Sequence, residues 1–188
     1  MKRKSVRIYS FTGTGSCLAL KLAEKLKQEG YVCTGYTVAR FAEDKRLQRL
    51  NDGWKQEIGA SWGEHALVFI GAAGIAIRAI APFVKDKFTD PPVIVLDEKG
   101  TFAIPLLSGH VGGGVTLAKV LAEYTGGRAV ITTATDVQKK FAADVFAWRT
   151  DSSLQTGKRR KKSRQGFLKK RIREFFQSFR FWGIYPKN

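Results

Sequence analysis

The sequence predicts an α/β fold, a mostly parallel β-sheet flanked by helices. Short apolar runs of strand length alternate with segments of helical periodicity through residues 6–132. Two of these runs, residues 66–70 and 92–96, are continuously apolar, which is typical of strands buried on both faces in a parallel sheet. Glycine-rich turns at residues 71–74 and 108–114 lead from apolar runs into helical segments.

The first half of the chain begins with a strand and a clear helix. Strands are expected at residues 6–11, 31–38 and 66–70, and a helix at residues 17–28. Leu18, Leu22 and Leu26 share one face of this helix, and Gly30 ends it. Residues 12–16 are predicted as a loop that lacks both the third glycine of a dinucleotide-binding turn and the lysine of a P-loop.

The middle and the second half continue the alternation. Residues 40–63 are polar and irregular with helical stretches, in which Trp54 and Trp62 pack against the core, and His65 is a capping or surface residue. Residues 97–100 form a tight turn that makes the next strand a hairpin partner of the strand before it. The remaining strands are expected at residues 92–96, 101–105 and 129–132, and helices at residues 75–81 and 115–124.

The totals of the sequence fit one domain with an appendage. The chain has 188 residues, of which 44% are hydrophobic, enough for a packed core. It contains no apolar run long enough to span a membrane and no secretory signal, so a cytoplasmic protein is expected. Cys17 and Cys33 do not have the spacing of a zinc site and are predicted to be buried free thiols.

The net charge of +17 is distributed unevenly. Residues 149–188 contain 13 Lys or Arg and two acidic residues, so we predict an α/β domain at residues 1–148 and a basic tail, disordered or loosely helical, at residues 149–188. Within the tail, four apolar residues fall on one helical face among basic residues: Leu168, Ile172, Phe175 and Phe179. A basic amphipathic helix of this kind suits an anionic membrane surface or nucleic acid.

The glycine-rich turns predict an anion site, because such turns aim backbone N–H groups at a ligand. Residues 109–116 nearly match a P-loop, but Val115 replaces the lysine, which favours a carboxylate over a nucleoside triphosphate. We expect the turns to share one rim at the carboxyl ends of the strands. The candidate binding residues are Gly71, Gly74, Arg78, Gly109, Gly112, Gly113, Thr133 and Thr135. For Arg78, a solvated helix residue is the alternative.

The candidate catalytic residues are His110, Ser108 and Asp136. His110 can act as a general acid or base near neutral pH, or it can be a structural histidine that holds the turn. Ser108 lacks the context of a nucleophile and is predicted to be a hydrogen-bond donor. Asp97 and Asp136 are candidate partners of His110, and Asp136 could equally cap a following helix. No protein metal site is expected.

The same stretches resemble a known family. Residues 68–82, with Lys85 to Lys87 and Asp90, residues 95–98, residues 106–113 and residues 130–136 resemble the N-terminal and middle parts of the cobalt-precorrin 5A hydrolases of cobalamin (vitamin B12) biosynthesis. The resemblance implies hydrolysis of the ring A lactone of a cobalt-containing tetrapyrrole in the anaerobic route, giving cobalt-precorrin 5B and acetaldehyde. It also implies other enzymes of that pathway as partners, a cytoplasmic location, and no cofactor, because the substrate carries the cobalt.

The chain departs from the family at two places. Gly114-Val115 replaces the usual Ala-Asn, and residues 149–188 do not resemble the family's C-terminal domain. We interpret the tail as the product of a shifted reading frame, which would leave a truncated chain without full activity. The alternative is a genuine tail, which would make the protein a binder of nucleic acid or anionic membranes.

Overall fold

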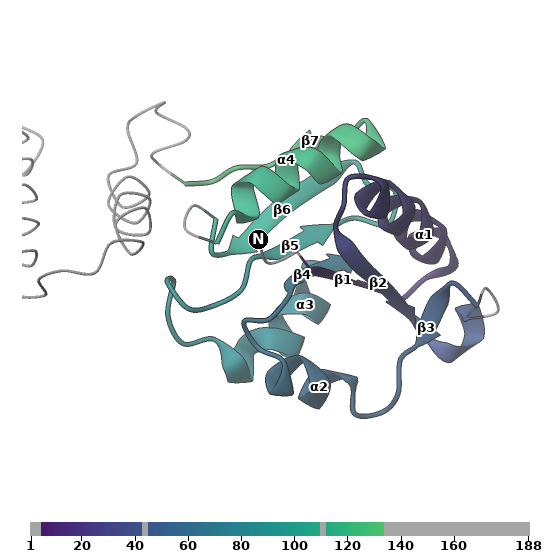
Figure 1. The fold of residues 1–188 in the computed structure, drawn as a ribbon, viewed down its shortest axis with the longest axis horizontal. Helices are drawn as coiled ribbons and strands as arrows, with labels where there is room; N and C mark the ends of the chain where they lie inside the picture. Colours follow the sequence, from purple (N-terminus) through teal and green to yellow (C-terminus); the bar gives the residue numbers. More distant parts are fainter. Residues whose placement is uncertain (1–4, 43–44, 110–111, 134–188) are drawn as a thin grey trace, which may run out of the picture. The chain divides into compact units, whose positions relative to one another are not determined.

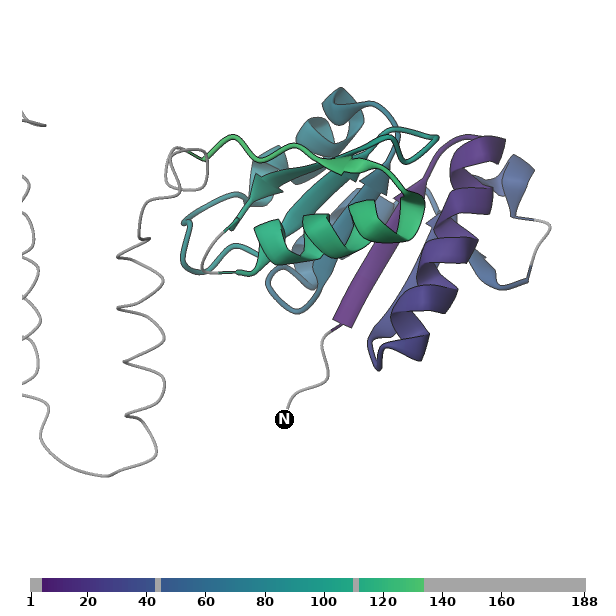
Figure 2. The same cartoon turned by 90° about the horizontal axis from the view of Figure 1, so that it is seen from above.

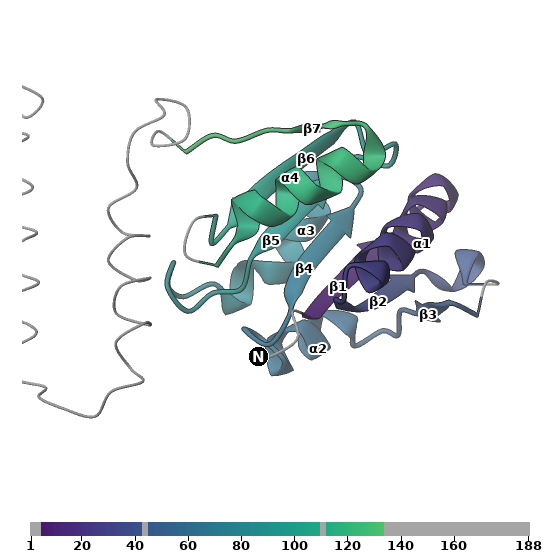
Figure 3. The ribbon, with the colours of Figure 1, turned by 45° about the horizontal axis from the view of Figure 1, so that its top comes forward.

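A computed structural model of the chain describes residues 5–42, 45–109 and 112–133. They form a seven-stranded sheet of order β3-β2-β1-β4-β5-β6-β7 with helices on both faces (Figures 1 and 3). The strands are β1 (Ser5–Ser10), β2 (Val32–Thr37), β3 (Leu47–Arg49), β4 (Ala66–Ile70), β5 (Val93–Leu96), β6 (Phe102–Leu107) and β7 (Arg128–Ala129). The helices are α1 (Gly13–Gln28), α2 (Trp54–Ala60), α3 (Ala73–Ile80) and α4 (Gly114–Thr125), with 3₁₀ turns at Ala39–Phe41 and Ala81–Phe83. The predicted α/β class is confirmed, whereas the predicted boundary at residue 148 and the basic tail lie outside the described residues.

The direction of the strands changes once. Strands β1 to β5 all run in the same direction. Strand β6 is antiparallel to β5, and β7 is parallel to β6. We call the edge at which β1 to β5 end the carboxyl edge, and the opposite one the amino edge. The predicted hairpin is confirmed: Asp97 at the carboxyl edge accepts hydrogen bonds from the backbone N–H groups of Lys99 (2.9 Å) and Phe102 (2.7 Å). Asp97 therefore holds this turn.

Each face of the sheet has its own core because successive side chains of a strand point to opposite faces. Val6 and Ile8 of β1 pack under α1 and α4, which lie on the same face (Figure 2). Tyr9 packs on the other face with residues of α2 and α3, and Trp54 and Trp62 pack against this core as predicted.

The two cysteines differ from each other. Burial raises the pKa of the Cys33 thiol to about 11, as fits the predicted buried thiol. Cys17 is exposed on α1, so the prediction of burial is wrong for it. Its neighbours Ser16 and Ala19 occupy the buried face of the helix instead.

The start of one helix and the absence of a strand after residue 40 are also predicted wrongly. Helix α1 begins at Gly13 rather than residue 17, since the Thr12 hydroxyl accepts a hydrogen bond from the Gly15 N–H (3.0 Å) and caps the helix. Strand β3 lies within the stretch predicted to be irregular. It pairs with β2 where Gly35 leaves room for the Leu47 side chain, because a Cβ at residue 35 would lie 2.5 Å from Leu47 Cδ2.

Candidate functional site

A cavity of about 520 Å³, open to solvent, lies at the carboxyl edge. It is lined by residues that follow β1 and β2, by the end of β3 and the loop after it, by the first turn of α2 and by α3. These residues include Phe11, Arg49, Trp54, Lys55, Ile75 and Arg78. The chain runs outward from β1 to β2 and β3, and then returns to place β4 on the other side of β1. Ligands of open α/β sheets bind outside the carboxyl ends of the strands beside such a change of direction. The cavity therefore occupies the position where this architecture favours a ligand.

The charge of the cavity wall is mainly positive. Arg49, Lys55 and Arg78 come from three different elements, and Asp52 is the acidic residue of the wall. The Arg78 guanidinium turns back along α3, where its Nη1 donates a hydrogen bond to the carbonyl oxygen of Gly74 (3.1 Å). Among the predicted binding residues, the structure thus brings Gly74 and Arg78 together beside this cavity.

Aromatic rings form the apolar part of the wall. The rings of Phe11 and Trp54 lie with centroids 5.6 Å apart, and Trp54 packs on Tyr9 at 5.8 Å. Tyr9 also stacks on Tyr36 and Phe69 at 5.2 and 5.1 Å. Burial raises the pKa of the Tyr9 hydroxyl to about 12, so this ring stays neutral and supports the wall rather than acting as an acid or base.

The sequence did not identify Phe11, Arg49, Trp54 or Lys55 as site residues. Arg49 and Lys55 lie in a polar stretch without periodicity, and Trp54 was predicted as a core residue. They meet at the cavity because β3 pairs with β2 and α2 returns the chain to the sheet. No local sequence signal marks them, because their place at the cavity depends on the order of the strands in the sheet.

The turn after β6 lies at the amino edge and is closely packed. Ser108 has a positive φ of 51°, and its hydroxyl donates a hydrogen bond to the carbonyl oxygen of Asp90 (2.6 Å). The carbonyl oxygen of Ser108 in turn accepts from the N–H of Gly114 (3.1 Å). A Cβ at Gly112 would lie 2.6 Å from Ser108 Cβ and 2.9 Å from its carbonyl oxygen. In this structure the Ser108 hydroxyl donates to the backbone, and its predicted role as a donor in the site stays a prediction.

Asp90 fixes the loop against which this turn packs. Its side chain is 6% exposed, and its carboxylate accepts hydrogen bonds from the N–H groups of Lys85 (3.1 and 3.0 Å) and Asp86 (3.1 Å). It also accepts from the indole Nε1 of Trp62 (3.0 Å). The buried carboxylate of Asp90 therefore connects the loop before β5 to Trp62, just after α2. The backbone carbonyl oxygen of the same residue connects this loop to Ser108.

The prediction of a single rim is wrong. Gly71, Gly74 and Arg78 lie at the carboxyl edge, whereas Ser108, Gly109, Gly112 and Gly113 follow β6 and lie at the amino edge. The reason is the reversal of direction at the hairpin, which places the end of β6 beside the start of β5. Thr133 follows β7, which runs parallel to β6 and thus leads away from the cavity. His110, Thr135 and Asp136 lie outside the described residues.

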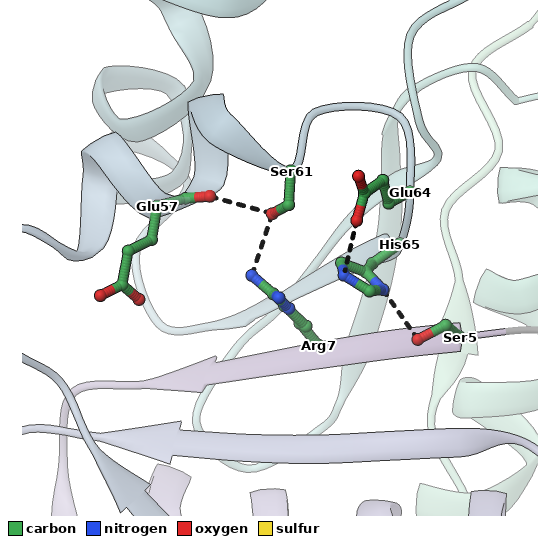
Figure 4. A network of polar contacts seen from close by, with 6 residues as sticks. All are labelled: Ser5, Arg7, Glu57, Ser61, Glu64 and His65. Carbon is green, nitrogen blue, oxygen red and sulfur yellow. Dashed lines mark hydrogen bonds and ion pairs between the residues drawn. The ribbon is translucent and has the colours of Figure 1, made fainter.

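A polar network covers the starts of β1 and β4 on the face of α2 (Figure 4). Arg7 Nη1 donates to the Ser61 hydroxyl (3.0 Å), and His65 Nδ1 lies 2.8 Å from the Ser5 hydroxyl. Burial and the Arg7 guanidinium lower the pKa of His65, although the Glu64 carboxylate opposes this shift. His65 is thus partly buried and joins two strands, rather than being a free surface residue.

The comparisons with known proteins agree on one relationship. Residues 58–136 match the family model described as Cobalamin synthesis G N-terminal. Cobalt-precorrin-5A hydrolase of Salmonella typhimurium is 38% identical over 164 residues, covering 82% of this chain and 42% of that protein. The chain is related to the N-terminal part of the cobalt-precorrin-5A hydrolase family. The hydrolase of Priestia megaterium is 47% identical over 83 residues, which cover 44% of this chain and 22% of that protein.

A solved structure supports the same family. A cobalamin biosynthesis protein G homolog from Sulfolobus solfataricus superposes with a TM-score of 0.54 at 26% identity, covering 68% of this chain and 36% of that one. The resemblance drawn from the sequence is confirmed. The chain spans less than half the length of the curated hydrolases that it matches.

The described residues leave some predictions untested. Their helices do not combine the length and apolar character that would be needed to cross a membrane. Within them, no group of three or more His, Cys, Asp or Glu side chains is arranged to hold a metal ion. The interpretation of the protein as a binder of nucleic acid or anionic membranes rests on residues 149–188, which the structure does not describe.

Proposed function

We propose that this chain acts in cobalamin biosynthesis as the N-terminal part of a cobalt-precorrin-5A hydrolase and holds the tetrapyrrole substrate at the carboxyl edge. The observation that carries the proposal is the cavity where Arg49, Lys55 and Arg78 face an aromatic wall. A cobalt-containing tetrapyrrole intermediate combines an apolar ring system with many carboxylate side chains. Cations beside aromatic rings match both parts of such a ligand, since charge-assisted hydrogen bonds to carboxylates are among the stronger ones in proteins.

The reaction adds water to the acyl carbon of the ring A lactone. The ring opens, the extruded carbon leaves with its methyl group as acetaldehyde, and cobalt-precorrin 5B remains. This chemistry needs a base for the water and donors for the oxyanion that forms. We propose His110 as the base, Asp136 as its partner and Ser108 as a donor, which requires the Ser108 O–H to leave the Asp90 carbonyl oxygen. The cobalt is carried by the substrate, and no further cofactor is proposed.

The separation of the two edges limits how these residues can cooperate. Strand β4 has five residues, so at ~3.3 Å per residue roughly 13 Å separate the Cα atoms of its first and last residues. Arg78 and Ser108 consequently cannot contact the same carboxylate or the same acyl carbon. If both act on the substrate, they contact different parts of it, and their substitution should affect different kinetic constants.

The test is the release of acetaldehyde from cobalt-precorrin 5A by the full chain, with the Salmonella hydrolase as the active reference. We expect release that is abolished in His110→Ala. We expect Arg78→Gln to raise KM about tenfold while kcat changes little, because it removes a contact made equally in the ground and transition states. No release by this chain beside an active reference would refute hydrolysis by the chain itself.

A further inference from the structure

The position of Arg78 depends on a missing side chain. Its guanidinium lies over Gly74, one turn earlier in α3, where long helical side chains naturally point toward the helix N-terminus. A Cβ at residue 74 would lie 3.1 Å from Arg78 Nη1 and 3.8 Å from Cζ. This spacing is tighter than an ordinary van der Waals contact, so a methyl group at this position would require the guanidinium to shift by a few tenths of an ångström. Gly74 thus leaves the space that Arg78 occupies.

The hydrogen bond to Gly74 uses only one of the N–H donors of Arg78. A guanidinium has five N–H donors, and one N–H of Nη1 is directed at the carbonyl oxygen of Gly74. The hydrogen bond holds Nη1 beside the first turn of α3, while the residue remains exposed and lines the cavity. Arg49 and Lys55 line the same cavity from β3 and α2, so the positive charge there comes from three directions. A planar guanidinium with free donors and two further cations lining the same cavity is suited to a carboxylate.

The aromatic wall adds a second requirement on the ligand. Phe11 and Trp54 line the cavity, and Trp54 packs on the ring of Tyr9, which is 2% exposed. A rigid apolar wall beside a cationic group favours a carboxylate carried on a short hydrocarbon arm over a small inorganic anion. Acetate and propionate side chains of a tetrapyrrole have this composition.

We propose that the cavity is a recognition subsite for one carboxylate side chain of the substrate, that Arg78 binds this carboxylate, and that Gly74 is the residue that positions Arg78. This inference rests on the proposed function and goes further by assigning separate roles to two residues. Gly74 does not line the cavity itself, so its influence on binding passes through Arg78.

The experiment measures binding of cobyrinic acid, a cobalt corrinoid whose side chains end in carboxylates, by isothermal titration calorimetry. Cobinamide, in which amides replace these carboxylates, is the comparison ligand. We expect Arg78→Gln to weaken binding of cobyrinic acid about tenfold and to leave cobinamide binding unchanged. Lys119→Gln removes the same charge from the exposed face of α4 and should change affinity less than about twofold, since distant exposed charges are screened.

Gly74→Ala is the sharper variant because it changes no charge. We expect about threefold weaker binding of cobyrinic acid, with no loss of stability to urea, since alanine favours a helix more than glycine does. In the Arg78→Gln background, Gly74→Ala should have no additional effect, because the residue through which it acts is gone. An additive effect would refute the positioning role.

The outcomes separate this inference from the proposed function. Equal binding of cobyrinic acid by the wild-type chain and Arg78→Gln would overturn the inference, whether or not acetaldehyde is released. Equal binding of cobinamide and cobyrinic acid would overturn it as well. Loss of cobyrinic acid binding in Arg78→Gln, together with no acetaldehyde release by the wild-type chain, would support the subsite and refute hydrolysis by this chain.

Discussion

The two edges of the sheet share one sequence pattern, a strand followed by a glycine-rich turn and a helix, yet they are built differently. At the carboxyl edge, the turn before α3 leads to Ile75 and Arg78, which line an open cavity together with the cations Arg49 and Lys55. At the amino edge, the turn before α4 is filled by its own backbone, with Ser108 bonded to Asp90 and Gly112 packed on Ser108. The comparison teaches that a glycine in such a turn can make room for a neighbouring side chain, as Gly74 does for Arg78, or for the backbone itself, and that the pattern alone does not distinguish these two uses.

The largest effect is expected where the amino edge depends on one buried carboxylate. Asp90→Ala leaves the N–H groups of Lys85 and Asp86 and the Trp62 indole without their acceptor. We expect the free energy of unfolding to fall by about 3 kcal/mol, because each of these donors loses a hydrogen bond to a charged group. Urea denaturation followed by far-UV circular dichroism measures the free energy of unfolding of the wild-type chain and of Asp90→Ala.

The control for this variant lies in the same loop. Asp86→Ala removes an exposed carboxylate that accepts one hydrogen bond, from the Phe88 N–H (2.7 Å), and should cost about 1 kcal/mol or less. Equal losses in the two variants would mean that Asp90 does not anchor the amino edge. The contrast between the edges would then rest on the glycines alone.

The next effect compares the same substitution at both edges. Gly112→Ala places a methyl group 2.6 Å from Ser108 Cβ, which we expect to cost about 2 kcal/mol of stability through overpacking. Gly74→Ala meets the movable end of Arg78 instead and should raise stability by up to about 1 kcal/mol. Urea denaturation of both variants tests this prediction, and losses of equal size would remove the distinction between the two turns.

Much of the fold could be predicted from the sequence, because buried strands and amphipathic helices leave strong local patterns. The continuous apolar runs of β4 and β5 and the Asp97 turn were such signals, and each was found in the structure. Strand β3 was missed since only Leu47 of its residues is buried, so its partner β2 determines it rather than its own pattern.

The site was harder to predict than the fold. The hairpin that the sequence predicted also reverses the chain, and this reversal takes the turn after β6 away from Arg78. The prediction of a single rim was therefore inconsistent with the predicted hairpin. A strand that returns antiparallel must end at the opposite edge of the sheet, so the turn at residues 108–114 could not lie beside the turn at residues 71–74. Arg49 and Lys55 could not be assigned to a site in this way, because their contribution depends on the order of strands in the sheet.

A smaller effect separates backbone strain from hydrogen bonding at Ser108. Ser108→Ala loses the bond to the Asp90 carbonyl oxygen but keeps the positive φ, so stability should fall by about 1 kcal/mol. Ser108→Gly loses the same bond and relieves the left-handed strain, so the change should stay within about 0.5 kcal/mol. Thermal and urea unfolding of the two variants measures this difference in stability. A larger loss of stability in Ser108→Gly than in Ser108→Ala would contradict the strain assigned to the positive φ of Ser108.

The smallest effect concerns pH and the network of Figure 4, in which His65 Nδ1 lies 2.8 Å from the Ser5 hydroxyl. Burial, helped by the Arg7 guanidinium and opposed by the Glu64 carboxylate, lowers the pKa of His65 in the folded chain below its ordinary value. The unfolded chain therefore takes up this proton first as the pH falls through about 6.5, and stability is lost there.

We expect the stability difference between the wild-type chain and His65→Gln to shrink between pH 7.5 and pH 5, because glutamine keeps a hydrogen-bonding group but binds no proton. Urea unfolding of both chains at these two pH values measures the difference. Other titrating groups contribute equally to both chains and cancel in this comparison, so a difference that grows toward pH 5 would mean that the folded network favours the protonated imidazole. Such a result would make the amino edge the edge that holds a proton, in contrast to the fixed cations of the carboxyl edge.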